Sequence, residues 1–314
     1  MVKTAFLFPG QGSQAIGMGQ SLLETSAVAR SVMEEVDAAL GGGLGQIMKD
    51  GPEDMLRMTR NAQPALMATA LMATRAIEDR FGKSLDQIGH AVAGHSLGEY
   101  AALAAAGTFD IATAAKLLRL RGDSMQNAVP VGEGAMAALL GADLQQVEDI
   151  ISHQNWTALD VANDNAPGQV VISGAVADVD AALELAKEMG IRRALKLPVS
   201  APFHCRLMAP AADAMATALA GVTMHPPSLP VFCNVTAEQE TDPSVLRENL
   251  ITQVTGLVRW RETLTNMAKS GIGRFVEIGT GKVLTGLVKR TLPDVEALNV
   301  ETPEGIDAFA ELYH

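Results

Sequence analysis

The chain has 314 residues, of which 48% are hydrophobic and 19% charged, and these fractions are typical of a globular protein and exclude a disordered chain. Its formal net charge of −12 argues against nucleic acid and anionic membranes as partners, so an anionic substrate needs a local cluster of positive charge. The longest uncharged stretch, at 214–237, is interrupted by prolines, so we expect no membrane-spanning helix. Two cysteines without metal or redox spacing, Cys205 and Cys233, favour a cytoplasmic protein.

The first stretch of the chain is expected to form a buried strand at 3–8, which runs into the loop P-G-Q-G-S-Q at 9–14. With Ala15 this loop spells G-x-G-x-x-A, which approaches a dinucleotide-binding fingerprint. We reject that interpretation, because the acidic residues at the expected distance lie inside an amphipathic helix at 26–40 and not at the end of a second strand. The loop is instead expected to present Gln11 to a polar atom elsewhere in the fold.

Three further helices are predicted from their first residues. Pro52 is expected to begin a short helix and Pro64 a long one at 64–81, since a proline in the first turn removes no intrahelical hydrogen bond. Asp110 is expected to cap a helix at 111–126, because its carboxylate can accept from a free backbone N–H there.

The sequence G-H-S-L-G-E at 94–99 stands between an apolar strand at 91–93 and an alanine-rich helix at 100–106. Its spacing matches the G-x-S-x-G nucleophile elbow, in which two glycines let a strand and a helix nearly touch. Ser96 would then stand at a helix N-terminus, where free N–H groups can hold a developing oxyanion. We therefore predict acyl chemistry at Ser96; the alternative is an ordinary glycine-flanked turn between a strand and a helix.

The pattern of the chain changes at Gly134. Strands and helices are expected there in the order βαββαβ, at 135–140, 143–152, 157–162, 169–173, 176–189 and 193–197, with a turn at 163–168. This order is that of the ferredoxin-like split unit. We predict a small ferredoxin-like domain at 131–197, inserted into a large α/β domain formed by 1–130 and 198–314.

The last part of the chain returns to alternating elements. A helix is expected after His204, then strands at 231–233, 274–278 and near 298, and helices at 243–254, 258–269 and 282–290. Alternation of this kind predicts a parallel sheet covered by helices on both faces. The expected fold class is α/β, with an α/β-hydrolase-like parallel-sheet core in the large domain.

A nucleophilic serine needs a base, and the chain has six histidines. His204 ends the proline-stiffened segment 198–204, which leaves a strand at the kind of position where α/β folds place active sites. His95 adjoins the serine in sequence and is expected to point away from it. A purely structural role for His204 remains the alternative. No H-E-x-x-H motif or Cys/His cluster predicts a metal site.

Arg121 lies on the flank of the apolar stripe of the helix at 111–126. A guanidinium is costly to bury without an anion, so either a carboxylate of the protein or one of the substrate is expected beside it. A nearby nucleophilic serine favours the substrate. The sequence G-T-G-K at 279–282 resembles a phosphate loop but lacks the spacing of one, and a tight turn that opens a helix explains it.

Taken together, these motifs give the chain a family resemblance. They comprise F-P-G-Q-G-S-Q at 8–14, Q-P-A at 63–65, G-H-S-L-G-E at 94–99, R-G at 121–122, N-D-N-A-P-G-Q at 163–169, P-F-H at 202–204 and G-T-G-K at 279–282. Over nearly its whole length the chain resembles the malonyl-CoA:acyl carrier protein transacylases, the acyltransferases of fatty acid synthesis. Several ordered motifs are far more specific than any one alone.

The resemblance implies a role for each of several residues. Ser96 would be the acylated nucleophile and His204 its general base and acid. The oxyanion-binding residues would be Gln11 and the backbone N–H of Leu97. Arg121 would bind the malonyl carboxylate, and the backbone carbonyl of Gln253 would orient the histidine. Phe203 resembles the bulky residue of malonyl-selective members, which leaves little room for a 2-methyl group on the substrate.

By the same resemblance, the reaction is a ping-pong transfer of a malonyl group from malonyl-CoA to the phosphopantetheine thiol of acyl carrier protein. It implies no metal and no cofactor beyond the CoA thioester of the substrate. Two alternatives are a serine esterase or thioesterase of the α/β-hydrolase type and a non-catalytic acyl-carrier scaffold. Acyl carrier protein is typically acidic, so a basic cluster is expected to dock it, either Arg192, Arg193 and Lys196 or Lys282, Lys289 and Arg290.

Overall fold

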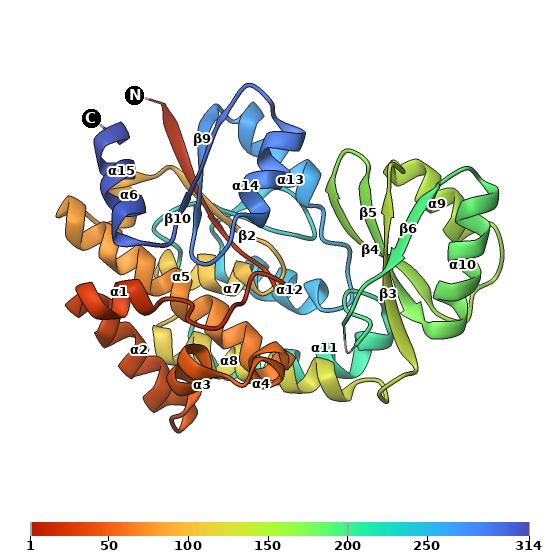
Figure 1. Ribbon diagram of the computed structural model, residues 1–314, viewed down its shortest axis with the longest axis horizontal. Coiled ribbons are helices and arrows are strands. Elements are labelled where there is room, and N and C mark those ends of the chain that lie inside the picture. Colours follow the sequence, from red (N-terminus) through yellow and green to blue (C-terminus); the bar gives the residue numbers. More distant parts are fainter. Residues whose placement is uncertain (1, 200, 314) are drawn as a thin grey trace.

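A computed structural model describes residues 2–199 and 201–313 of the chain. Its larger sheet has six strands in the order β10-β9-β1-β2-β7-β8 (Figure 1). The strands are β1 (Lys3–Phe8), β2 (Ala91–Gly94), β7 (Val231–Phe232), β8 (Gln239–Glu240), β9 (Ile272–Ile278) and β10 (Glu296–Val300). All neighbours are parallel except the edge pair β7 and β8, so the expected parallel sheet is confirmed, with one unpredicted antiparallel edge strand.

Helices cover both faces of this sheet, because successive side chains of a strand point to opposite sides. On β1, Phe6 and Phe8 enter the large apolar core, whereas Ala5 and Leu7 enter a smaller one on the other face. The larger core is formed with α2 (Ala27–Leu40), α5 (Thr59–Phe81), α7 (Gly98–Ala105), α8 (Ile111–Asn127), α11 (Ala209–Ala220), α12 (Pro243–Gln253) and α15 (Pro303–Tyr313), and the smaller one with α13 (Trp260–Lys269) and α14 (Val283–Thr291).

Pro52 and Pro64 do not begin helices as predicted. Helix α5 starts at Thr59, and Pro64 lies inside it, while Pro52 caps the short α4 (Glu53–Arg57) from outside. Nearly every residue of α5 up to Thr74 is buried, so tertiary packing stabilises a helix that lacks one backbone donor. Other short helices not predicted are α1 (Gln20–Thr25), α3 (Leu44–Asp50), α6 (Leu85–Ile88) and the 3₁₀ turn Arg206–Met208, and α15 was also missed.

A second, antiparallel sheet lies beside the first, at the right of Figure 1. Its strands β3 (Gly134–Leu140), β4 (Leu159–Ala166), β5 (Gln169–Ala175) and β6 (Arg193–Lys196) have the order β4-β5-β3-β6. They share a separate apolar core with α9 (Leu144–Ser152) and α10 (Val176–Glu188). The succession of strands and helices along 134–196 is the one that the sequence predicted.

One prediction in this region is wrong. Asn163, Asp164 and Asn165 belong to β4 and not to a turn, and only Pro167 and Gly168 join the two strands. The pairing of β4 with β5 shifts register twice in this stretch, as at β-bulges, which redirect side chains. The strand also contacts the segment that precedes α13, beside the larger sheet. The Asp164 N–H donates to the carbonyl of Val258, and the Val258 N–H donates to the carbonyl of Ala162.

In the part of the chain that the structure describes, no helix combines the length and the apolar character that crossing a membrane requires. Within the same residues, no three His, Cys, Asp or Glu side chains are grouped so that they could hold a metal ion.

Candidate active site

The corner between β2 and α7 is too tight for any side chain at its two glycines. A Cβ atom on Gly94 would lie 1.9 Å from the carbonyl carbon of Gly98, and one on Gly98 would lie 2.2 Å from the carbonyl oxygen of Phe8. Ser96 stands at the apex with a backbone φ of 53°, a value that residues other than glycine rarely adopt. The register aligns Phe8 with Gly94, so this corner and the loop after β1 meet at the carboxyl edge of the sheet.

Ser96 and His204 lie in contact although 108 positions separate them in sequence. Serine Oγ and histidine Nε2 are 2.7 Å apart, and Nδ1 of the same ring lies 2.8 Å from the backbone carbonyl oxygen of Gln253. Burial, and then the positive charge of Arg121, lower the pKa of His204 to about 3. The imidazole is therefore neutral near pH 7 and, with Nδ1 donating to the carbonyl, presents a free lone pair to the serine hydroxyl.

Arg121 reaches the same point from α8, and its side chain is only 1% exposed. One terminal nitrogen, Nη1, donates to Oε1 of Gln63 at 2.9 Å. The other, Nη2, donates to Oγ of Ser96 at 3.2 Å and to Oε1 of Gln253 at 3.0 Å. All three acceptors are uncharged, and no ion pair joins this guanidinium to an acid within the described residues. A buried cation that no carboxylate contacts directly can therefore bind a carboxylate that enters the pocket.

Gln11 and Leu97 flank the serine from two neighbouring strand ends. Gln11 lies in the loop after β1, where its Nε2 donates to Oγ1 of Thr59 at 3.4 Å. Leu97 begins the turn into α7, and its backbone N–H has no acceptor among the described residues. Free N–H groups at the start of a helix suit a developing negative charge.

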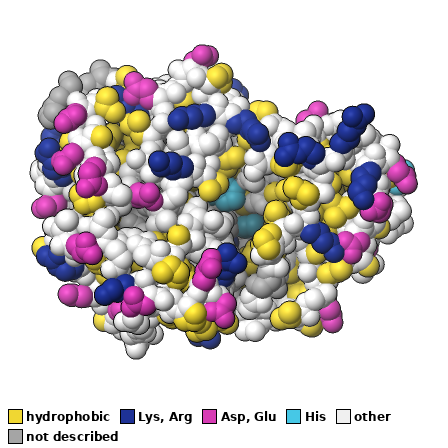
Figure 2. All heavy atoms as spheres, viewed as in Figure 1, with side chains coloured by type: hydrophobic (Ala, Val, Ile, Leu, Met, Phe, Trp, Pro, Cys, Tyr) yellow, Lys and Arg dark blue, Asp and Glu magenta, His cyan; other side chains and the backbone are white. Residues whose placement is uncertain are grey.

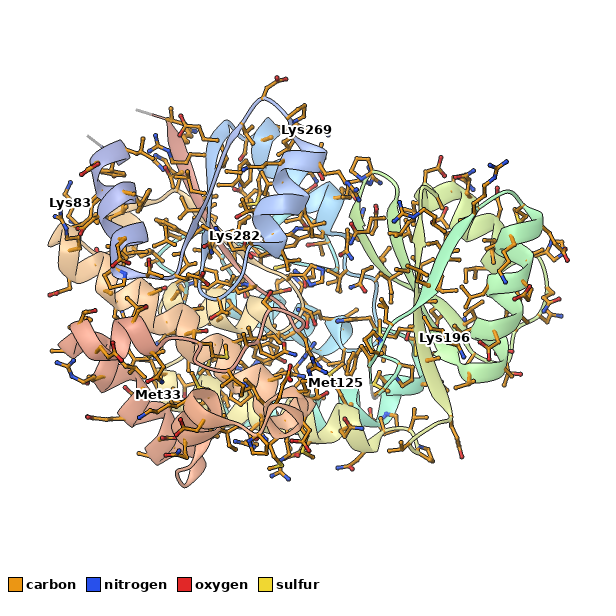
Figure 3. The ribbon with its side chains drawn as sticks, in the orientation of Figure 1. Met33, Lys83, Met125, Lys196, Lys269 and Lys282 are labelled. Atoms are coloured by element: carbon orange, nitrogen blue, oxygen red, sulfur yellow. The ribbon has the colours of Figure 1, made fainter. Side chains whose placement is uncertain are left out.

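These residues share one pocket of about 880 Å³. Figure 2 shows the molecule hollowed between its two parts, with histidine side chains visible in the hollow, and Figure 3 labels Met125 near the same region. The lining includes Gln11, Ser96, Leu97, Arg121 and His204, together with an apolar wall of Met125, Met136, Val171, Leu197 and Phe203. Gln253 is fully buried and is hydrogen-bonded to both Arg121 and His204. All six residues singled out in the sequence for the site therefore gather at one place.

The side chain of His95 contacts the second sheet and makes no hydrogen bond to Ser96 among the described residues. Its ring lines the pocket, with Nε2 2.7 Å from Oδ1 of Asn165 and its edge against Trp260 at 5.4 Å between ring centres. Burial lowers the pKa of His95, against the hydrogen bond that its ring donates to Asn165, which raises it. No sequence pattern indicated this partner, because the bulged end of β4, which supplies Asn165, was predicted to be a turn.

Asn234 was missed altogether. Its Oδ1 accepts the backbone N–H of Ser96 at 2.7 Å, and its Nδ2 donates to the carbonyl of Gly94 at 2.7 Å. The side chain thus braces the corner on both sides of the serine. A signal was present in the sequence, because Asn234 closely follows a predicted strand, β7, that pairs with β2.

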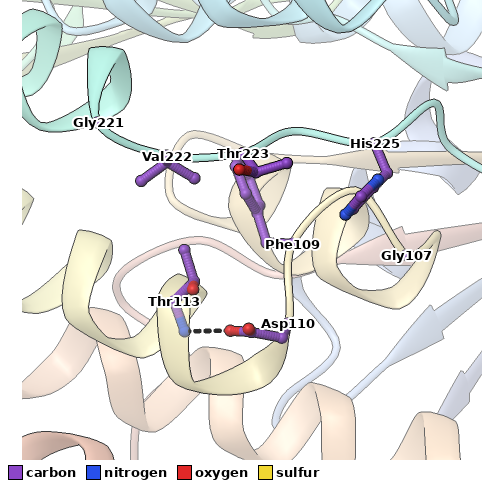
Figure 4. A pocket seen from close by; sticks show the side chains of 8 residues that line it. All are labelled: Gly107, Phe109, Asp110, Thr113, Gly221, Val222, Thr223 and His225. Atoms are coloured by element: carbon purple, nitrogen blue, oxygen red, sulfur yellow. Dashed lines mark hydrogen bonds between the residues drawn. The ribbon is translucent and has the colours of Figure 1, made fainter.

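A second pocket, of about 460 Å³, lies between the loop before α8 and the segment after α11 (Figure 4). Asp110 lines it, but its carboxylate already accepts the N–H of Thr113 at 2.6 Å as a helix cap. No nucleophile and base meet there among the residues described, so the chemistry belongs to the first pocket.

The chain is similar to known proteins over nearly its whole length. The family model for the acyl transferase domain matches residues 5–305. Malonyl CoA-acyl carrier protein transacylase from Bacillus subtilis is 43% identical over 98% of this chain and 96% of its own length, and that of Escherichia coli K12 is 40% identical over 99% and 100%.

Among solved structures, the acyl-carrier-protein-S-malonyltransferase of Bartonella henselae is 49% identical, with a TM-score of 0.95 and 99% of each chain covered. A malonyl-transacylase solved in complex with a type II PKS acyl-carrier protein is 38% identical, with a TM-score of 0.94 and 99% of each chain covered. The chain therefore belongs to the acyl transferase domain family and, within it, to the malonyl-CoA:acyl carrier protein transacylases.

Proposed function

We propose that this enzyme transfers the malonyl group of malonyl-CoA to the phosphopantetheine thiol of acyl carrier protein through a malonyl-Ser96 intermediate, and so supplies fatty acid synthesis. One observation supports this most directly. The hydroxyl of Ser96 lies between a neutral base, Nε2 of His204 at 2.7 Å, and a buried cation, Nη2 of Arg121 at 3.2 Å. A nucleophile beside a carboxylate-binding group fits an acyl group that itself bears a carboxylate, as malonyl does.

In the first half-reaction, His204 takes the proton of Ser96 while Oγ attacks the thioester carbon of malonyl-CoA. The oxygen of the tetrahedral intermediate accepts hydrogen bonds from the Leu97 N–H and from Gln11. The carbon–sulfur bond then breaks, and the proton on His204 passes to the leaving CoA sulfur. In the second half, the carrier thiol gives its proton to His204 and attacks the malonyl ester, and the same proton returns to Ser96.

Arg121 selects the acyl group by charge. In the free enzyme its nitrogens donate to the amide oxygens of Gln63 and Gln253, so no carboxylate is bonded to the guanidinium directly. A malonyl carboxylate supplies that anion in bidentate geometry, whereas an acetyl group does not. Phe203, a bulky residue on the pocket wall, leaves little room for a 2-methyl substituent.

The reaction needs no cofactor beyond the CoA thioester, since the activated acyl bond arrives with the substrate.

We assign 1–130 and 198–314 to a large domain with an α/β-hydrolase-like core and 131–197 to an inserted ferredoxin-like domain. The support for the inserted domain is its strand order, β4-β5-β3-β6, and its separate apolar core. The free, buried cysteines Cys205 and Cys233 fit a reducing cytoplasm.

Carrier protein must reach the pocket through its mouth, and two exposed basic clusters are candidates for docking it. Arg193 and Lys196 lie on β6 of the second sheet and Arg192 directly before it, and Lys282, Lys289 and Arg290 lie at the start and end of α14. Figure 3 labels Lys196 and Lys282 on opposite halves of the molecule. Two members are engaged already, since Lys196 pairs with Asp180 at 2.6 Å and Arg290 donates to Gln169. Arg192, Arg193, Lys282 and Lys289 are the stronger candidates.

A serine esterase or thioesterase of the hydrolase type fits less well. Such enzymes orient the histidine with an acidic side chain, whereas Nδ1 of His204 here meets a backbone carbonyl. Arg121 also has no role in hydrolysis of an uncharged acyl group.

Intact mass after incubation with malonyl-CoA tests the proposal. The wild-type enzyme is expected to gain one malonyl group and to lose it when carrier protein is added. Ser96→Ala is expected to gain none, while Ser228→Ala, which alters an exposed serine outside the pocket, behaves as wild type. Labelling of the Ser96→Ala variant would refute the nucleophile. Loss of malonyl to water as fast as to carrier protein would favour the thioesterase.

A further inference from the structure

Glu99 closes the G-H-S-L-G-E motif, and the proposed reaction gives it no task. It lies on the first turn of α7, with an exposed fraction of 0%. A carboxylate buried this fully is costly unless its surroundings use its charge or its hydrogen bonds.

Its contacts lead to both halves of the catalytic pair. Oε2 of Glu99 accepts from Nε2 of Gln253 at 2.7 Å and from the backbone N–H of Asn234 at 3.0 Å. Gln253 holds Nδ1 of His204 with its carbonyl, and Asn234 holds the N–H of Ser96 with its side chain. The carbonyl of Ser96 in turn accepts from the Glu99 N–H at 3.0 Å and from Gln253 Nε2 at 3.0 Å. One carboxylate oxygen therefore fixes the two residues that orient base and nucleophile.

The charged and titratable groups around Glu99 come from two neighbouring elements and from α7 itself. Arg121 reaches it from α8, Cys233 from the end of β7, and Tyr100 follows it on α7. The other oxygen, Oε1, is buried without a hydrogen-bond partner among the described residues. Burial raises the pKa of Glu99 to about 7, although hydrogen bonds from Asn234, Gln253 and Cys233 and the charge of Arg121 lower it. The carboxyl group can thus change its charge near neutral pH.

We propose that Glu99 is a positioning residue that supplies, through Gln253, the negative charge missing from the Ser96–His204 pair. The inference rests on the proposed acyl transfer. When His204 takes the serine proton it becomes an imidazolium, and its Nδ1–H bond to the Gln253 carbonyl strengthens. The ionised Glu99 carboxylate, hydrogen-bonded to the amide of that same Gln253, favours this positive charge. When Glu99 is protonated, its packing is unchanged, but it no longer carries the negative charge that favours the imidazolium.

Glu99→Gln separates charge from geometry. The amide oxygen can take the place of Oε2 and keep the bonds from Gln253 and Asn234, while the NH₂ group occupies the position of the unpartnered Oε1. We expect kcat/KM for malonyl transfer to be about tenfold lower than in wild type at pH 8 and nearly equal at pH 6. The ratio of the two enzymes is the readout, because it cancels titration of the substrate's own phosphates.

Two further variants and one further measurement support the test. Glu277→Gln alters another buried carboxylate, which accepts from Leu284 and Thr285, and is expected to leave the ratio to wild type independent of pH. Glu99→Asp keeps a charge and is expected to keep the pH dependence at a lower rate. Inactivation of wild type by a neutral fluorophosphonate, which requires only Ser96 and its base, is expected to accelerate as pH rises through about 7.

A Glu99→Gln enzyme that matches wild type at both pH values would overturn the inference. So would a wild-type inactivation rate that is flat between pH 6 and 8, a result that depends on no variant folding. A wild-type enzyme that takes up no malonyl group at all would instead refute the proposed function, so the two failures are distinguishable.

Discussion

Nδ1 of His204 lies 2.8 Å from the backbone carbonyl oxygen of Gln253, and among the described residues no acidic side chain bonds to the ring. Gln253 is the last residue of α12, so its carbonyl has no partner within the helix and points from the negative end of the helix dipole. A helix end thus does part of what an aspartate does in other serine enzymes. It fixes the tautomer of the imidazole without placing a full negative charge against it.

Arg121→Ala is expected to abolish the preference for malonyl-CoA over acetyl-CoA. Loss of a charge-assisted contact to the malonyl carboxylate lowers kcat/KM for malonyl-CoA by about 10- to 100-fold and leaves that for acetyl-CoA little changed. Steady-state kinetics with both thioesters measure the ratio. Arg119→Ala, on the same helix but bonded to Asn61, serves as the control and should retain selectivity. Unchanged selectivity in Arg121→Ala would remove the carboxylate-binding role.

Arg121 also affects how pH acts on the base. Its charge is the second cause that lowers the pKa of His204, after burial, so Arg121→Met is expected to raise that pKa. His204 works as a base only when neutral. Between pH 6 and 4 the wild-type inactivation rate by a neutral fluorophosphonate should therefore hold steady, whereas that of Arg121→Met should fall as pH decreases. Parallel profiles for the two enzymes would contradict this coupling.

Gly98→Ala is expected to destabilise the enzyme and to disturb the corner at Ser96. Its methyl group would lie 2.2 Å from the carbonyl oxygen of Phe8, and backbone cannot yield as a flexible side chain does. We expect Tm to fall by about 5 °C or more. Gly286→Ala, in α14 with open space at its Cβ, is the matched control and should leave Tm unchanged or slightly raised. Equal Tm values for the two variants would show that the corner between β2 and α7 accommodates a methyl group at position 98.

Charge reversal can locate the docking surface for carrier protein. Arg192→Glu with Arg193→Glu changes one cluster, and Lys282→Glu with Lys289→Glu the other. The pair that contacts the acidic carrier should raise KM for carrier protein about tenfold or more, because attraction becomes repulsion, and leave acylation by malonyl-CoA intact. Stopped-flow acylation and steady-state transfer separate the two steps. If both double variants bind carrier protein normally, docking lies elsewhere on the surface.

Local patterns predicted local structure well where one interaction dominates. Asp110 caps α8 as its residue type indicates, with its carboxylate on the N–H of Thr113. Pro64 shows the opposite case, because burial along α5 outweighs the preference of proline for a first turn. The bulged end of β4 reads as a turn from its Asn and Asp residues, and only pairing with β5 and contact with Val258 make it a strand.

The sequence alone determined the alternation of strands and helices, the strand–corner–helix unit at Ser96 with Glu99 on its first turn, and the family resemblance, because each depends on residues close together in the chain. Tertiary structure alone decided which distant groups meet that serine. His204 comes 108 positions later, Asn234 138 and Gln253 157 positions later. Distances between such segments depend on how strands pair and helices pack, and no short-range pattern records them.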